Sequence, residues 1–283
     1  ELTYNPDGSI TQKVKVTETV TITDEEGKKV KAERARQEFI KKVAIFPFDY
    51  NGEKEEIKWL QYGIPYGTCI SLLQDEHIDL QFPNGQELGY KEFSKKLRSI
   101  GYENGTNVPL ALRKKIANEI HCDFFIIGNI SNDDANKVST KLYNTENGKL
   151  ISEMEINDNN IFNIIDKISM FHRKEMGIPK SHIESNTNLS SSELITEFED
   201  AFKNNIKGIL KRQYENDYEG SISFLQHAMK IDPNYCLGAS SIWNSAFGQN
   251  REEHQSLLDN TMKTAIRNIY RVPDRLKFRI KIG

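Results

Sequence analysis

Two stretches of the chain stay apolar over the length of a β-strand. One is KKVAIFPFDY at residues 41–50, and the other is CDFFIIGNI at residues 122–130. Apolar runs without alternation are typical of strands that are buried on both faces of a sheet. Segments with helical spacing lie between the two runs. Because strands connected through helices usually pair in parallel, we expect these two at the centre of an open α/β sheet.

The segments around these strands complete one α/β domain. Apolar residues recur at three- and four-residue intervals in the segments predicted as helices, which are residues 64–74, 90–100, 109–121 and 161–176. Further strands are predicted at residues 78–82, and at residues 137–143 and 150–156 as a hairpin around Asn147 and Gly148. Pro65 is expected in the first helical turn, where its missing N–H costs no hydrogen bond. We therefore predict an α/β domain with an open, mixed (α+β) sheet over residues 42–177.

The segment before the first buried strand has a different character. Residues 10–22 alternate apolar and polar side chains, and residues 28–30 begin a return strand after a turn. Residues 31–41 are charged and favour a helix. We interpret residues 1–41 as a β-rich, charged connector outside the core, with a disordered arm as the alternative.

The second half of the chain reads as helical. Residues 178–192 are rich in Ser and Asn and are predicted to be an interdomain linker. Gly208, Ala228 and Pro233 have the spacing of a tetratricopeptide helical hairpin, so residues 193–283 are predicted to be an all-α tetratricopeptide solenoid segment. Since roughly three repeats are needed for a stable solenoid, we expect the array to continue past the last residue. The helices are expected at residues 193–214, 218–230, 234–248 and 252–269, and from Pro273 onward.

Composition limits the classes of function. The 283 residues are 37% hydrophobic and 28% charged with a net charge of −3, which is typical of a soluble globular chain. Basic residues are matched by acidic ones, so no nucleic-acid partner is expected. No apolar run reaches the roughly 20 residues that span a bilayer, so membrane contact is expected only through a segment outside this chain. The three cysteines lie far apart in apolar segments and are expected to be buried thiols.

Four segments follow one another in a characteristic order: KKVAIFPFDYNGE at the first buried strand, WLQYGIPY at the first helix, ALRKKIANEIHCDFFIIGNIS at the second buried strand and VSTKLYNTENGKLIS at the hairpin. Together they resemble the TolB-like amino-terminal domain that precedes tetratricopeptide repeats in many bacterial signalling proteins. The later runs MKIDPNYCLGASS and VPDRLKFRI resemble the repeats of that family, so the resemblance covers residues 42–283. The chain departs from the family pattern at Tyr62, where Asp is usual, and at Asn129, where Ser is usual.

The resemblance implies a non-catalytic sensor or scaffold region of a larger bacterial signalling protein. In this family such modules are joined to serine/threonine kinases, nucleotide cyclases or winged-helix regulators, often across a membrane span. The segment WLQYGIPY is most similar to the kinase-linked form, which implies an extracytoplasmic, periplasmic location. The chain itself has no kinase motif. Since it lacks an initial Met and stops within a helical pattern, we interpret it as part of a longer protein.

Side chains capable of catalysis or metal binding do not form a constellation in the sequence. The run HCD at residues 121–123 lies at a helix-to-strand junction, where adjacent residues rarely converge on one metal ion. His172 and His182 have no partners at ligand spacing and are expected to be a solvated pair. The serines at residues 190–192 are interpreted as linker. No catalytic, metal-binding or cofactor-binding residue is therefore assigned, and no cofactor is expected.

The main hypothesis is a protein or peptide partner bound by the helical repeats, because stacked helix pairs present a concave surface. The candidate groove residues are aromatic: Tyr214, Tyr218, Tyr235 and Trp243. The sequence leaves self-association of the α/β domain open.

Two alternatives stay beside the main hypothesis. An enzyme site could lie at the carboxyl edge of the sheet near Asp49 and Gly63, because open α/β sheets bind ligands there. We favour loop capping for Asp49 and helix packing for Gly63. The other alternative is a structural scaffold of the cell envelope.

Overall fold

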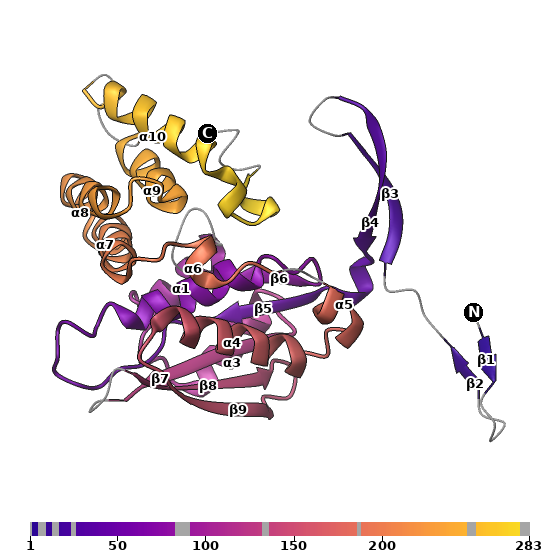
Figure 1. The fold of residues 1–283 in the computed structure, drawn as a ribbon. Coiled ribbons are helices and arrows are strands. Elements are labelled where there is room, and N and C mark those ends of the chain that lie inside the picture. Colours follow the sequence, from indigo (N-terminus) through magenta and orange to yellow (C-terminus); the bar gives the residue numbers. More distant parts are fainter. Residues whose placement is uncertain are drawn as a thin grey trace.

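The computed structural model describes residues 2–4, 10–12, 17–23, 27–82, 91–131, 136–185, 188–247 and 253–277. Its main parts are a five-stranded sheet with helices on both faces and a succession of helices that packs against one side of this layered unit (Figure 1). Within the described ranges, no helix is both long enough and apolar enough to cross a membrane.

The central sheet has the strand order β6-β5-β7-β8-β9. Its strands are β5 (Lys41–Ile45), β6 (Ile78–Gln81), β7 (Phe124–Ile130), β8 (Lys137–Asn144) and β9 (Leu150–Asn157). The two apolar strands β5 and β7 are parallel neighbours, whereas β7, β8 and β9 form an antiparallel series. The predicted open, mixed α/β sheet with a parallel central pair is therefore confirmed.

The first apolar run leaves the regular strand earlier than predicted. Strand β5 ends at Ile45, and the chain resumes pairing with β7 only at Asp49, whose N–H donates to the Gly128 carbonyl at 2.8 Å. Pro47 lies between these points, and a proline has no N–H to donate to a sheet ladder. Residues 43–50 of the run nevertheless stay buried apart from half-buried Asp49, and helix α1 (Leu60–Leu72) covers one face of them.

Pro65 lies inside helix α1 rather than in its first turn, so that prediction was wrong. A proline at this position leaves the carbonyl four residues earlier without its helical donor. That carbonyl belongs to Gln61, and it accepts the N–H of Phe48 at 2.8 Å. The Gln61 side chain donates in return to the Phe48 carbonyl at 3.1 Å. The helix therefore tolerates the proline because the segment after β5 replaces the missing hydrogen bond.

Helices cover both faces of the sheet because strand side chains alternate between them. Val43 and Ile45 belong to the core shared with α1 and α4 (Ile161–Glu175). Ala44 points to the other face, where α2 (Lys91–Ser99) and α3 (Leu110–Glu119) pack. All three cysteines are buried and free, as predicted.

Gly128 on β7 is required for the close approach of the segment after β5. A Cβ atom at this position would lie 2.3–2.5 Å from ring atoms of Phe48, a fully buried side chain. We expect Gly128→Ala to lower the free energy of unfolding by about 1–3 kcal/mol through overpacking. Urea denaturation would measure this loss. Asn129→Ala changes the exposed neighbouring residue and should stay within about 0.5 kcal/mol of the native protein.

The N-terminal segment forms two-stranded ribbons. Strands β1 (Leu2–Tyr4) and β2 (Ile10–Gln12) pair with each other, as do β3 (Thr17–Thr23) and β4 (Lys29–Ala35). The β3–β4 hairpin projects from the layered unit (Figure 1). The helical preference expected from residue 31 was wrong, since only a short 3₁₀ turn, η1 (Gln37–Phe39), follows β4. Helix propensity is weak, and here pairing along all seven residues of β3 overrides it.

The C-terminal half is helical, as predicted, but its first helix is divided. The single helix expected at residues 193–214 is wrong, because α6 (Ser191–Leu194) and α7 (Glu199–Leu210) are separated by residues 195–198. Within this break, the Thr196 hydroxyl donates to Asp232 Oδ2 at 2.7 Å, which fastens the break to the end of α8 (Tyr218–Ile231). The other elements are α5 (Lys180–Ser185), the π-helical turn η2 (Lys211–Glu215), α9 (Cys236–Phe247), α10 (Gln255–Arg267) and η3 (Ile269–Arg271).

Phe202 on α7 connects the helical half to the layered unit. Its ring lies 5.7 Å from that of Trp59, 6.3 Å from that of Tyr66 and 5.9 Å from that of Phe162. Trp59 precedes α1, Tyr66 lies on α1 and Phe162 lies on α4, so one aromatic cluster spans three separate segments. Since this cluster belongs to one continuous apolar core, the division into domains at residues 178–192 stays a prediction.

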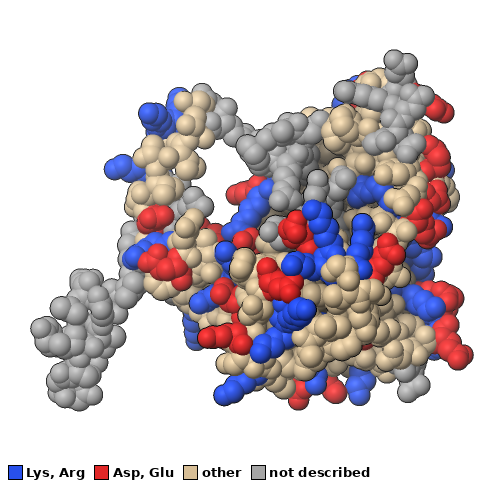
Figure 2. Space-filling model, turned by 180° about the vertical axis from the view of Figure 1, so that it is seen from behind, with Lys and Arg blue, Asp and Glu red and all other residues tan. Residues whose placement is uncertain are grey.

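Charged side chains of both signs are interspersed on the face of the molecule shown in Figure 2. Exposed pairs of opposite charge also cross the outer strands, such as Lys141 with Glu153 at 2.9 Å and Lys137 with Glu155 at 3.6 Å. Pairs of this kind contribute little stability because solvent screens them. The mixture of positive and negative side chains in Figure 2 agrees with the sequence, whose net charge is only −3.

Candidate functional site

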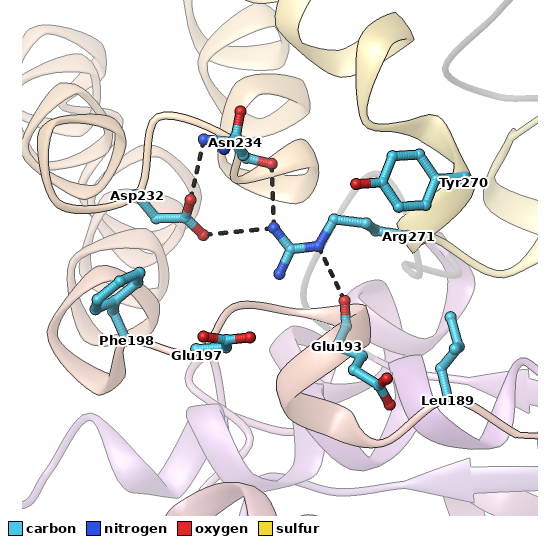
Figure 3. A pocket seen from close by; sticks show the side chains of 8 residues that line it. All are labelled: Leu189, Glu193, Glu197, Phe198, Asp232, Asn234, Tyr270 and Arg271. Atoms are coloured by element: carbon cyan, nitrogen blue, oxygen red, sulfur yellow. Dashed lines mark hydrogen bonds and ion pairs between the residues drawn. The ribbon is translucent and has the colours of Figure 1, made fainter.

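A groove opens where three segments of the helical half meet (Figure 3). It has a volume of about 400 Å³. One wall comes from the segment around α6, the second from the turn between α8 and α9, and the third from η3. We name it the Arg271 groove; its lining residues are Leu189, Glu193, Glu197, Phe198, Asp232, Asn234, Tyr270 and Arg271.

Arg271 fixes the inner wall of this groove. Its Nε donates to the Glu193 carbonyl at 3.0 Å, and Nη1 donates to the Asn234 carbonyl at 3.5 Å. Nη1 also lies 3.8 Å from the carboxylate of buried Asp232, which itself accepts the Asn234 N–H at 2.9 Å. Figure 3 shows the guanidinium group directed between these partners. The side chain therefore ties η3 to two other segments and holds the three walls in place.

The rim of the groove is apolar and exposed. Tyr270 is 68% exposed, Phe198 is 49% exposed and Leu189 is 39% exposed. Figure 3 shows Phe198 and Tyr270 on opposite sides of the Arg271 guanidinium group. Aromatic side chains of this exposure supply large contact areas at low entropic cost when a partner covers them.

The same rim carries negative charge. Glu193 and Glu197 are exposed, and the guanidinium group of Arg271 is already engaged by groove atoms. Hydrogen bonds from Ser190, which caps α6, lower the pKa of the Glu193 carboxyl and keep it ionised. The groove therefore combines exposed apolar side chains with carboxylates, a surface that complements cationic and apolar groups.

A second hollow of about 490 Å³ adjoins the groove and shares Leu189 and Tyr270 with it. Residues before β6, residues of α5 and of the stretch after it, and residues beyond η3 line this hollow, including Glu76, His182 and Arg275. The Arg275 guanidinium group donates to the carbonyls of Glu76, at 2.9 Å, and Ile78, so it connects the C-terminal segment to the start of β6. Together the two hollows form an extended depression along the stretch 188–198.

The aromatic residues predicted from the sequence do not line the Arg271 groove. Tyr235 is fully buried in the core, and Trp243 stacks on Phe247 with ring centroids 4.5 Å apart. Tyr214 packs against Tyr62 at 5.9 Å, and Tyr218 begins α8 as a half-buried residue. The structure does not gather these four residues into one surface.

The contacts of Asp49 and Gly63 fit a structural role for both residues. The Asp49 carboxylate accepts two hydrogen bonds from buried Arg113, at 2.6 and 2.7 Å, and one from the Asn107 N–H at 2.8 Å. A Cβ atom at Gly63 would lie 2.8 Å from the Trp59 ring, so this glycine allows close packing. The geometry of these two residues does not support an enzyme site at the sheet edge.

The two histidines predicted to be a solvated pair have separate partners, and only His182 is partly exposed, so that prediction was wrong. His172 is fully buried on α4, and its Nε2 lies 2.8 Å from the Thr140 hydroxyl. His182 on α5 lies 3.1 Å from the Asp75 carboxylate. Sequence spacing could not show these partners because they lie 32 and 107 positions away. The capping serine of α6, Ser190, lies within the serine run that was interpreted as linker.

The groove residues themselves were not identified from the sequence. Phe198 lies four positions before Phe202, and on a continuous helix both would point to the same face. The break before α7 places Phe198 in an extended conformation, with φ −104° and ψ 108°, so only Phe202 enters the core. A Thr followed by acidic residues at 196–200 is a helix-start signal that could have located this break.

Comparisons with known proteins find solved structures that are similar to this chain only at low TM-scores. No family model matches the chain, and no curated protein matches it. Solved structures similar to it include the LpoB C-terminal domain from Salmonella enterica, with 11% identity, a TM-score of 0.29, and coverage of 42% of this chain and 83% of that domain. TolB from Acinetobacter baumannii has 14% identity and a TM-score of 0.30, over 58% of this chain and 31% of TolB. A lipoprotein from Neisseria meningitidis has 9% identity and a TM-score of 0.30, over 49% of this chain and 99% of the lipoprotein.

These scores do not establish a family for the chain. TolB is among the similar structures, and the sequence also resembles a TolB-like domain. At a TM-score of 0.30, however, this similarity gives no information about function. Neither tetratricopeptide repeats nor a link to a kinase receives support from the comparisons, and both stay predictions.

Proposed function

We propose that this chain is a non-catalytic, protein-binding module that holds a cationic, apolar peptide segment of a partner protein in the Arg271 groove. The observation that carries the proposal is the exposure of Phe198 and Tyr270 beside carboxylates, around an inner wall that Arg271 fixes. Exposed aromatic side chains at the edge of a preformed groove are typical anchors for peptide recognition. The carboxylates of Glu193 and Glu197 would select Lys or Arg side chains in the peptide.

We further propose that α7 to α10 are tetratricopeptide-type repeats, following a TolB-like domain at residues 42–177. Two features support this assignment. Consecutive helices from α7 to α10 contact each other in order (Figure 1). Helices α7 and α8 also approach so closely that a Cβ atom at Gly208 would lie 2.6 Å from Leu225 Cγ, which explains the small residue expected there. The groove then lies beside the first repeats.

The resemblance in the sequence also leads us to propose an extracytoplasmic location and a role as the sensor or scaffold part of a signalling protein, with a kinase as the output domain. In this scheme, occupation of the groove would shift the position of the helical half on the layered unit. The Phe202 cluster is the contact through which such a shift would pass.

A displayed library of random peptides, selected on the purified chain, tests the binding role. Selected peptides should contain Lys or Arg next to large apolar residues, and fluorescence anisotropy with one labelled peptide would then give its Kd. We expect Phe198→Ala and Tyr270→Ala each to weaken binding by about tenfold or more, since exposed aromatic anchors dominate such interfaces. Neither change should lower the free energy of unfolding by more than about 0.5 kcal/mol, because both side chains are exposed.

Phe247→Ala is the matched control. Phe247 is 45% exposed, close to the value for Phe198, but it lies on α9 beside Trp243. Its replacement should leave peptide binding unchanged. If the Phe247 variant loses binding while the Phe198 and Tyr270 variants retain it, the functional surface is the one predicted from the sequence around Trp243, and the Arg271 groove is rejected. Sedimentation velocity on the same samples would reveal self-association.

A further inference from the structure

Three side chains with metal-binding atoms meet at the start of β6. Asp75 and His77 lie in the short connection between α1 and β6, and His182 comes from α5, more than a hundred positions later. One ligand atom from each residue lies within 4.8 Å of the other two. The sequence separation means that only the tertiary fold brings them together.

The geometry of the cluster is close to that of a metal site. Asp75 Oδ1 lies 3.1 Å from His182 Nε2 and 3.6 Å from His77 Nδ1. In a tetrahedral zinc site with bonds of about 2.0–2.1 Å, neighbouring ligand atoms are about 3.4 Å apart. Two of the three separations therefore already fit, and the third needs at most a modest side-chain rotation.

His77 supplies the second, independent observation. Its side chain is fully buried, yet neither ring nitrogen has a hydrogen-bond partner among the described residues. Buried polar atoms are nearly always satisfied, so a buried imidazole without hydrogen bonds calls for a ligand. The ring lies 4.3 Å from that of His182, and Nδ1 faces the Asp75 carboxylate, so it is directed into the cluster.

The surroundings orient the carboxylate. Asp75 Oδ1 accepts the N–H of His77 at 2.9 Å, while Oδ2 lies 3.7 Å from Nε of Arg173. Arg173 is itself held by a hydrogen bond of 2.5 Å to the Ser71 carbonyl. Outer partners of this kind fix the orientation of metal ligands. The positive charge of Arg173 also opposes a cation, so we expect weaker binding than at four-ligand structural sites.

Imidazole nitrogens are common ligands of zinc and other transition metals. Solvent reaches the cluster through His182, which is partly exposed and lines the hollow next to the Arg271 groove.

We propose that Asp75, His77 and His182 bind a divalent transition-metal ion, for which Zn²⁺ is the best match. Two imidazole nitrogens and one carboxylate oxygen are the ligand types that zinc accepts, whereas Mg²⁺ and Ca²⁺ require oxygen ligands. Three protein ligands leave one position for water or for a group from a partner. The bound ion would fasten α5 to the start of β6. This site is independent of the peptide-binding role.

Titration of tag-free, chelator-treated protein with ZnCl₂ in a calorimeter tests the proposal, with thermal unfolding as a second readout. We expect a single Zn²⁺ per chain, a higher Tm with the metal, and an affinity at least about tenfold lower in His182→Ala and Asp75→Asn. Replacement by Co²⁺ should give the visible absorption of a tetrahedral site without a thiolate band.

His254→Ala is the matched control, because His254 is also partly buried and pairs with a carboxylate, that of Glu219 at 3.3 Å. It should bind Zn²⁺ like the native protein. His182→Ala removes a partly exposed side chain, so circular dichroism should show a native fold. The proposal is overturned if native protein binds Zn²⁺ no more tightly than His182→Ala, or if His254→Ala loses binding equally.

Discussion

Replacing Asp49 by alanine should lower the free energy of unfolding by about 3–5 kcal/mol, the usual cost of leaving one member of a buried ion pair without its partner. Arg113 is the group left behind. Its side chain is 2% exposed, and both of its hydrogen bonds to Asp49 come from the same nitrogen, Nη2. The guanidinium group also lies 5.6 Å from the centre of the Phe46 ring, so it cannot reach solvent without disrupting the core on that face.

A double variant separates the loss of the ion pair from the other effects of Asp49→Ala on stability. Asp49→Ala combined with Arg113→Met removes both charges and keeps an unbranched apolar side chain on α3. Because apolar replacements of buried pairs are often neutral or stabilising, the double variant should recover at least half of the loss. Asp49→Asn retains an acceptor for the Asn107 N–H and should cost less than Asp49→Ala.

Guanidinium chloride denaturation would measure these free energies. A loss below about 1 kcal/mol for Asp49→Ala would mean that the pair behaves as a solvated surface pair, contrary to its burial. Retention of peptide binding by the double variant would show that Asp49 supports the fold rather than the function.

The native protein should lose stability as the pH falls below 6.5, and a large part of this loss should come from His172. Complete burial lowers the pKa of His172 from 6.5 to about 3. The Thr140 hydroxyl donates to the Ile127 carbonyl, so it accepts from His172 Nε2–H, which leaves Nδ1 as the deprotonated nitrogen. Among the described residues Nδ1 has no hydrogen-bond partner, so a proton added there would be buried without an acceptor.

The direction of this change in stability follows from the number of protons that the folded and unfolded states bind. Between pH 6.5 and about 3, His172 is protonated in the unfolded chain and neutral in the folded one. The unfolded state therefore binds more protons, and stability rises with pH through this window. The full difference corresponds to about 5 kcal/mol, of which about 2 kcal/mol is lost between pH 7 and pH 5.

Urea denaturation at a series of pH values from 7 to 5 would check this. His172→Gln, which retains a donor for Thr140, should show a loss smaller than the native one by about 2 kcal/mol over this interval. His227→Gln alters an exposed histidine and should keep the native slope. Equal slopes for the native protein and His172→Gln would show that His172 is charged, and hence hydrated, in the folded state.

The local pattern of apolar and polar residues was enough to predict the central sheet and the helices that cover its two faces. The two apolar runs could be satisfied only by burial on both faces, so they became the parallel neighbours β5 and β7. The Asn147–Gly148 turn specified the hairpin of β8 and β9, and Gly148 adopts the positive φ of 73° that such turns require. These features depend on residues close in sequence, which is why the sequence alone determined them.

Departures from prediction occur where a distant segment changes a local preference. Pro65 lies within α1 because the Phe48 N–H reaches the Gln61 carbonyl, and residues 29–35 form a strand because β3 pairs with them. The break before α7 depends on the bond between Thr196 and Asp232. In each case, a hydrogen bond to another segment opposes the local preference, which is less than about 1 kcal/mol for ordinary residues and about 3 kcal/mol for a proline inside a helix.

The sequence by itself therefore determined the order and type of the main elements and the two faces of the sheet. The tertiary structure alone decided the Arg271 groove, the pairing of Asp49 with Arg113 and the meeting of Asp75, His77 and His182. The physical reason is that these sites join side chains separated by tens to more than a hundred positions. Hydrophobic periodicity says which face of an element is buried, but it does not say which buried or rim side chains will meet.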